Sequence, residues 1–176
     1  QVVYPALPDF IKLEDQSIKH ELGLPKKYLL FLGTLEPRKN IESVFSAFSE
    51  LGRPDYSLVI AGGQGWLYKK IYHLVKKLNL EHQVKFLGYV SPEQKKVLLT
   101  RASLLIWPSF YEGFGLPPVE AMSAGVPVIS SANSALPEVL GQAALLVDPY
   151  NVNEIKQAIN QVLNNHEIKI LAQYGK

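Results

Sequence analysis

Short apolar runs recur along the sequence, each of a length that suits one β-strand. They lie at 28–32, 57–61, 84–87, 103–107, 126–130 and 144–147, and most end directly at glycine or proline. Because the runs are apolar at successive rather than alternate positions, they predict strands that are covered on both faces. A parallel sheet between two layers of helices meets that requirement. The pattern therefore indicates a fold of the α/β class.

Segments with helical periodicity lie between the runs. Apolar residues recur at helical spacing within 41–51, 67–78 and 155–162, and Asn40 is the expected N-cap of the first segment. Residues 91–94, with the sequence SPEQ, have the pattern of a capping box with proline at the first helical position. This alternation predicts right-handed βαβ units and a doubly wound, mostly parallel Rossmann-like sheet. Such sheets bind ligands beyond the carboxyl ends of their strands, so we expect a site in those loops.

The length of 176 residues suits one domain of this kind. We expect it to occupy residues 28–176. Pro5, Pro8 and Pro25 interrupt the preceding stretch, which predicts an irregular linker and entry segment over residues 1–27.

Composition excludes several classes of function. The net charge of +2 gives no reason to expect nucleic acid as a partner, and no apolar run reaches the roughly 20 residues of a transmembrane helix. The absence of cysteine removes disulfides and thiolate chemistry and fits a cytoplasmic protein. The histidines are scattered and no Asp-x-Asp occurs, so no metal site is expected. Lysine pairs at 69–70, 76–77 and 95–96 are interpreted as solvated helix faces.

Two early loops carry candidate ligand-binding residues. Arg38 and Lys39 directly precede an expected helix, where fixed positive charge and the helix dipole favour a phosphate. The alternative is that they are two exposed basic residues in a loop. After the second run, Gly62, Gly63 and Gly65 allow either close approach of a ligand to the backbone or a tight turn.

The loop after the fourth run is the most informative. Glu112 lies in this loop, and Glu120 follows eight residues later inside an apolar helical segment, where a carboxylate is costly to bury without a partner. Gly113 and Gly115 leave backbone N–H groups accessible at the start of that helix. Carboxylates beside such groups suit a ligand that carries both hydroxyls and phosphates. The alternatives are a solvent-exposed loop acid for Glu112 and, for Glu120, a first-turn glutamate favoured by the helix dipole.

Several motifs in order resemble those of the retaining GT-B glycosyltransferases of family GT4, the glycosyltransferase group 1. They are GTLEPRKN at 33–40, LGYVS at 87–91, EGFGLP at 112–117, EAMSAGVPV at 120–128 and ALLVDP at 144–149. The resemblance extends from about Tyr28 to the last expected helix. It implies one half of a GT-B fold, namely the C-terminal Rossmann-like domain that binds the nucleotide-sugar donor.

The resemblance also implies roles for individual residues. Arg38 and Lys39 would neutralise the donor diphosphate and stabilise it as it leaves, and Glu112 would contact sugar hydroxyls near the reacting centre, which makes these three the expected catalytic residues. Glu120 would bind the ribose hydroxyls. The expected donor-binding set is Gly33, Thr34, Gly63, Tyr89, Val90, Gly113, Phe114, Gly115, Leu116 and Glu120. The reaction would retain anomeric configuration by front-face attack, without a metal or other cofactor.

The sequence departs from the family pattern in two respects. Thr34 stands where many members carry arginine, which leaves the phosphate charge to Arg38 and Lys39. A GT-B enzyme has two Rossmann-like domains, and we expect the acceptor-binding one outside these residues, since 2–5 resemble the crossover between the domains and the end at 176 is early. The chain alone would then bind donor and transfer sugar poorly. A glycan or lipid-linked acceptor would bind through the other domain, and the full-length protein could be peripheral to a membrane.

The residues indicate the identity of the nucleotide-sugar donor less directly. A guanine-binding loop would present a carboxylate to the base, and Glu93 could do so, but its position in a first helical turn explains it equally well. We therefore favour UDP-glucose, for polysaccharide biosynthesis, and keep GDP-mannose as the alternative. An NAD-binding Rossmann module is the rival of another class. It requires Gly-x-Gly-x-x-Gly after the first strand, where this chain has GTLEPR at 33–38.

Overall fold

The computed structural model describes residues 16–66 and 68–165. Six parallel strands form one sheet in the order β3-β2-β1-β4-β5-β6. The strands are β1 (Tyr28–Leu32), β2 (Ser57–Ala61), β3 (Val84–Gly88), β4 (Leu104–Trp107), β5 (Val128–Ser131) and β6 (Leu145–Val147). The predicted doubly wound α/β fold is thus confirmed, and strand bounds differ from the predicted ones by at most two residues.

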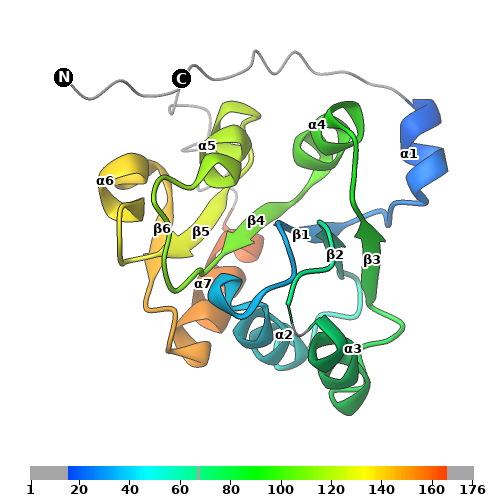
Figure 1. Ribbon diagram of the computed structural model, residues 1–176, viewed down its shortest axis with the longest axis horizontal. Coiled ribbons are helices and arrows are strands. Elements are labelled where there is room, and N and C mark those ends of the chain that lie inside the picture. Colours follow the sequence, from blue (N-terminus) through cyan, green and yellow to red (C-terminus); the bar gives the residue numbers. More distant parts are fainter. Residues whose placement is uncertain (1–15, 67, 166–176) are drawn as a thin grey trace.

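Helices cover both faces of the sheet (Figure 1). They are α1 (Gln16–Leu22), α2 (Ile41–Ser49), α3 (Tyr68–Lys77), α4 (Pro92–Arg101), α5 (Leu116–Ser123), α6 (Leu136–Leu140) and α7 (Val152–Asn164), with 3-10 turns η1 (Pro37–Lys39) and η2 (Gly141–Ala143). Helices α2, α3 and α7 form one hydrophobic core with the sheet, and α4, α5 and α6 form the other. Successive side chains of each strand point into the two cores in turn, which explains why the strands are apolar at successive positions.

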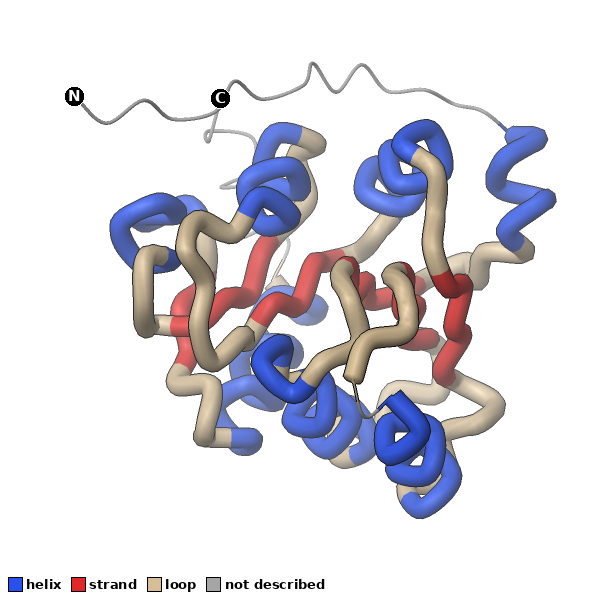
Figure 2. The backbone as a smooth tube through the Cα atoms, viewed as in Figure 1, coloured by secondary structure: helices blue, strands red, loops and turns tan. Residues whose placement is uncertain are grey.

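The strand order places a topological switch point between β1 and β4. Strand β1 pairs with β2 on one side and with β4 on the other, so the chain proceeds outward in opposite directions from this central pair. The loops after the strands gather along one edge of the sheet (Figure 2). The loops after β1 and β4 therefore begin on neighbouring strands and run in opposite directions. Sheets of this kind bind ligands between two such loops.

The expected irregular segment before β1 contains a helix, which corrects that prediction. Helix α1 ends at Leu22, directly before Gly23 with its positive φ of 54°, and the Glu21 side chain accepts a hydrogen bond from Gln94 of α4 at 3.1 Å. Its seven residues have too short an apolar pattern to indicate a helix, and contact with α4 stabilises it instead. The helical segment predicted over 67–78 starts at Leu67, which falls outside the described residues. The predictions for residues 2–8 and 175–176 also fall outside them.

Asn40 occupies the predicted N-cap position of α2, but its side chain does not cap the helix. The residue has a left-handed backbone with φ of 56°. Its amide Nδ2 donates to the carbonyl oxygens of Pro108, at 2.9 Å, and Pro149, at 2.7 Å. Asn40 therefore ties the loop after β1 to the loops after β4 and β6, a role that requires contacts across more than 60 residues of sequence.

The glycines after β2 serve a purpose that neither sequence interpretation anticipated. A Cβ atom on Gly62 would lie 2.0 Å from the carbonyl oxygen of Gly33, and one on Gly65 would lie 2.6 Å from that of Leu35. Gly62 also has a φ of +151°, and Leu35 forms an isolated bridge with Gln64. These two glycines therefore allow the loops after β1 and β2 to lie backbone against backbone. A Cβ on Gly63 would meet nothing, so this position stays open to a ligand.

Replacing Gly62 with alanine should lower the free energy of unfolding by about 2 kcal/mol, because the new methyl group meets backbone that cannot move aside. Gly63→Ala is the matched control, since it adds the same atom one residue away in open space. Chemical denaturation of both variants measures the difference. Equal stability of the two would show that the loops separate without cost.

Among the described helices, none combines the length and the apolar character needed to cross a bilayer.

Candidate functional site

The loops after β1 and β4 are joined at the switch point by main-chain and side-chain contacts. The backbone N–H of Phe110 donates to the carbonyl oxygen of Arg38 at 2.9 Å. Together with the Asn40 contact to Pro108, this bond fixes the turn η1 against the chain that leaves β4. Two hydrogen bonds thus hold the segments that carry the predicted catalytic residues against each other.

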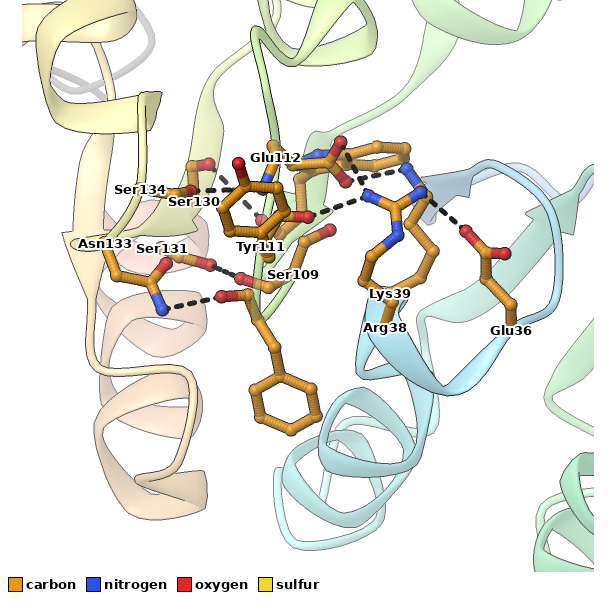
Figure 3. Close-up of polar contacts among 12 residues, drawn as sticks. Glu36, Arg38, Lys39, Ser109, Tyr111, Glu112, Ser130, Ser131, Asn133 and Ser134 are labelled. Carbon is orange, nitrogen blue, oxygen red and sulfur yellow. Dashed lines mark hydrogen bonds and ion pairs between the residues drawn. The ribbon is translucent and has the colours of Figure 1, made fainter.

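Arg38, Lys39 and Glu112 converge there on a single ion cluster (Figure 3). The Lys39 Nζ lies 2.6 Å from Oε1 of Glu112, and the Arg38 guanidinium lies 3.1 Å from Oε2 of the same carboxylate. Arg38 also contacts the Glu36 carboxylate at 2.7 Å and donates to the Tyr111 carbonyl at 2.7 Å. The structure therefore brings together all three residues that sequence analysis chose as catalytic.

Burial distinguishes the members of this cluster. Glu112 is 7% exposed and Lys39 is 9% exposed, whereas the Arg38 side chain is 43% exposed. Lys39 also lies over the ring of Trp107, 4.4 Å from its centroid, where the ring face attracts a cation. The alternatives of a solvated loop acid for Glu112 and an exposed loop lysine for Lys39 are therefore wrong. Two cations contact the single buried carboxylate of Glu112, which leaves one positive charge in excess. The Glu36 carboxylate balances this charge through its contact with Arg38.

The neighbouring carboxylates keep the Arg38 guanidinium protonated. Partial burial alone would lower the pKa of the guanidinium, but the carboxylates of Glu112 and Glu36 outweigh this effect and raise its pKa above the ordinary value. Arg38 thus stays protonated, and its exposed side can meet an anion from solvent.

Polar residues at the end of β5 and directly after it support the cluster, and they are not among the predicted site residues. Ser134 Oγ accepts the backbone N–H of Glu112 at 3.1 Å, and Asn133 Nδ2 donates to the Phe110 carbonyl at 3.0 Å. Ser131 Oγ donates to the Ser109 carbonyl. The signal was present in the sequence, because residues 130–134 read SSANS at the end of a predicted strand and in the loop that follows it. These side chains hold the 109–112 backbone from the side opposite Arg38 (Figure 3).

The start of α5 presents backbone donors close to the cluster in sequence. Gly115 is the N-cap, with φ of 81° and without a side-chain cap, and Leu116 is the first helical residue. Pro117 and Pro118 follow and have no N–H, so the free donors of this end are limited to Gly115 and Leu116. Substitution of Gly115 would strain its backbone and bring Cβ 2.5 Å from Leu136. Gly113 and Leu116 are exposed and Gly115 is buried, so only part of the loop 112–116 faces solvent.

Glu120 is buried in α5 and paired. It is the fifth residue of the helix, 8% exposed, and its Oε1 accepts a hydrogen bond from Lys95 Nζ of α4 at 2.6 Å. The dipole explanation for Glu120 is therefore wrong, because α5 has no acidic residue in its first turn. The interpretation of Lys95 as part of a solvated face is also wrong. A lysine on another helix could not be assigned to this carboxylate from sequence spacing.

The remaining predicted donor-binding residues lie along the same edge. Gly33 directly follows β1, and a Cβ there would lie 2.8 Å from the Trp107 ring. Thr34 follows it, and Tyr89 after β3 is 83% exposed, whereas Val90 packs against the core beneath α4. Gly113 and Leu116 are exposed and Phe114 is half-buried. The set is therefore spread along the carboxyl edge from β3 to α5, with the ion cluster near its centre.

Two other features bear on the edge. The Glu93 carboxylate accepts a hydrogen bond from Ser91 Oγ at 2.7 Å, which lowers its pKa, and the predicted capping box of Ser91 and Gln94 is present.

A cavity of about 220 Å³ opens beside the cluster, on the side of α2 and α3. It is lined by Glu36, Pro37, Asn40, Ile41, Glu42, Ser43, Trp66, Ile71 and Phe110. Within residues 16–66 and 68–165, no group of three or more acidic or histidine side chains is placed to hold a metal ion.

Comparison with known proteins gives consistent results. Residues 13–176 match the sequence model of a family described as glycosyl transferases group 1. The O-antigen chain mannosyltransferase B of Escherichia coli is 42% identical over 148 residues, which cover 82% of this chain and 39% of that protein. The chain thus spans about two fifths of the length of this curated relative.

Solved structures share the fold. The Anabaena protein Alr3699/HepE, in complex with UDP-glucose, superposes with a TM-score of 0.80 at 22% identity, over 90% of this chain and 45% of that one. The C-terminal domain of a glycosyl transferase group 1 family protein (LpcC) from Francisella tularensis superposes with a TM-score of 0.81 at 23% identity. That match covers 95% of this chain and 92% of the other, so its extent corresponds to a C-terminal domain.

Proposed function

Since this chain belongs to the glycosyl transferases group 1 family, we propose that it is the donor-binding domain of a retaining glycosyltransferase, which holds a nucleoside diphosphate-sugar at the carboxyl edge of its sheet. The observation that carries the proposal is the convergence of Arg38 and Lys39 on Glu112 at the switch point between β1 and β4. Rigid cations at such a point suit a diphosphate, and an adjacent carboxylate suits sugar hydroxyls.

The cluster suggests how the domain would assist the departure of the nucleoside diphosphate. Cleavage of the bond between the sugar and the diphosphate places negative charge on the leaving oxygen. Arg38 and Lys39 would meet that charge with donors already fixed in place, so little reorganisation is needed as the transition state forms. In the unliganded chain Glu112 holds both cations. A bound diphosphate would replace part of that contact and release the carboxylate toward the sugar.

Glu120 and the loop after β3 would hold the nucleoside. The carboxylate of Glu120 would accept the ribose hydroxyls, and the main chain near Tyr89 and Val90 would line the base. Residues 113–116 would supply backbone N–H groups to the sugar and phosphates. These groups leave the acceptor to the remainder of a longer protein, consistent with the two fifths of its relative that this chain covers. The proposal includes no metal, because the two cations already supply the charge.

Two donors have support from particular observations. The name of the E. coli relative favours a mannosyl donor, for which GDP-mannose is the candidate. UDP-glucose remains the choice from sequence, because the base loop has one carboxylate, Glu93, and the structure directs it to Ser91. The UDP-glucose complex of the Anabaena protein shares only the fold at its level of identity.

Calorimetric titration of the chain with UDP, GDP, ADP and NAD in parallel, without added metal, tests the function and the base together. We expect saturable binding of UDP or GDP that exceeds the binding of the other three ligands at least tenfold. Selective binding of GDP would favour the mannosyl donor. Binding of NAD alone would contradict the proposal, since a glycosyltransferase donor site does not require nicotinamide.

A further inference from the structure

A second ion pair joins two helices on the α4–α5 side of the sheet. Lys95 Nζ of α4 lies 2.6 Å from Oε1 of Glu120 of α5, and the Glu120 side chain is only 11% exposed. The Lys95 side chain is 33% exposed and thus only partly buried. This contact is separate from the cluster at Glu112, because it links different helices and involves a different carboxylate.

The position of Lys95 within α4 is unfavourable in the absence of such a partner. Helix α4 begins at Pro92 after the Ser91 cap, so Lys95 is its fourth residue, close to the end where the helix dipole is positive. The helix start is held by the capping box and by the contact of Gln94 with Glu21. Lys95 therefore extends from a helix start that these contacts hold and reaches the Glu120 carboxylate of α5.

We propose that Lys95 is a positioning residue that holds the Glu120 carboxylate in the orientation in which it receives the ribose hydroxyls of the donor. The inference rests on the proposed function, since it requires a nucleotide at this edge. Lys95 occupies one oxygen of Glu120, and a carboxylate has further lone pairs with which to accept hydroxyl groups. The ammonium group also offsets a negative charge that would otherwise repel an approaching diphosphate.

The proposal predicts a loss that depends on the ribose. Lys95→Met keeps the length of the stem and removes the charge, so Glu120 becomes free to rotate. We expect about tenfold weaker binding of the preferred nucleoside diphosphate, UDP or GDP, which is the scale of one charged hydrogen bond, and little change for inorganic pyrophosphate. The preference for the ribonucleotide over its 2′-deoxy form should also fall toward one. Lys95→Arg should restore much of this preference.

Lys76→Met is the matched control, because it removes the same charge from an exposed position of α3 on the opposite face of the sheet. Thermal unfolding of each variant shows whether the fold is retained. Equal weakening for the ribonucleotide, the 2′-deoxy form and pyrophosphate would overturn the positioning role, as would unchanged binding of all three. If the parent chain binds neither UDP nor GDP, the proposed function fails and this inference with it. If the parent binds and prefers ribose but Lys95→Met keeps that preference, the inference alone fails.

Discussion

Glu112→Gln is expected to bind inorganic pyrophosphate more tightly than the parent chain, by about tenfold. In the unliganded structure the Glu112 carboxylate holds Lys39 at 2.6 Å and Arg38 at 3.1 Å, so it competes with an incoming anion for the same two cations. The amide has nearly the same shape and still accepts a hydrogen bond from Lys39, but it has no charge. Removing the competitor therefore strengthens the binding of phosphate groups.

The same substitution should slow the transfer of the sugar. If Glu112 accepts sugar hydroxyls, the amide replaces a charged acceptor with a neutral one. In the full-length protein we expect transfer to fall by about 100-fold or more, the scale seen when a group that stabilises a transition state is lost. Calorimetry with pyrophosphate and a transfer assay measure the two effects separately. Glu36→Gln is the control, because the Glu36 carboxylate pairs with Arg38 rather than Lys39 and is more exposed than that of Glu112. Weaker binding of pyrophosphate by Glu112→Gln would contradict the competition between carboxylate and phosphate.

The sequence predicts the sheet well because each strand is short and mostly apolar, and most of the runs end directly at glycine or proline. All six runs are strands, and the longer helices lie between them. Helix α6 and the turn η2 were not predicted, because each is too short to show a period of 3.6 residues. The strand β5 begins at Val128 rather than at 126, since Pro127 has no N–H to donate and offers only its carbonyl to Leu105.

The members of the site were predictable, but their pairing was not. Arg38, Lys39, Glu112 and Glu120 are conspicuous because they follow predicted strands or interrupt an apolar helix. Which cation meets which carboxylate depends on the crossing of the chain from β1 to β4. Lys39 and Glu112 are 73 residues apart in sequence, and Lys95 and Glu120 are 25 apart on different helices. Such contacts arise from packing of the layers and leave no local pattern in the sequence.

The burial of Lys39 leads to the second large prediction, on stability and binding together. Lys39→Met should lower the free energy of unfolding by about 3 kcal/mol, since it leaves the carboxylate of Glu112 buried with only the more exposed Arg38 as a cationic partner. Binding of the nucleoside diphosphate should weaken by about 100-fold, because the more buried of the two proposed phosphate-binding cations is gone. Chemical denaturation and calorimetry on the same preparation measure both.

A double variant separates these two consequences. Lys39→Met combined with Glu112→Gln removes the unpaired buried charge, so stability should return to within about 1 kcal/mol of the parent chain. The binding of nucleoside diphosphate should not return, because no substitution replaces the lost cation. Arg38→Met is the comparison, since its side chain is 43% exposed and its loss should weaken binding with little effect on folding. Recovery of binding along with stability in the double variant would show that Lys39 supports the fold alone, and that the phosphate is held by Arg38 and the backbone at the start of α5.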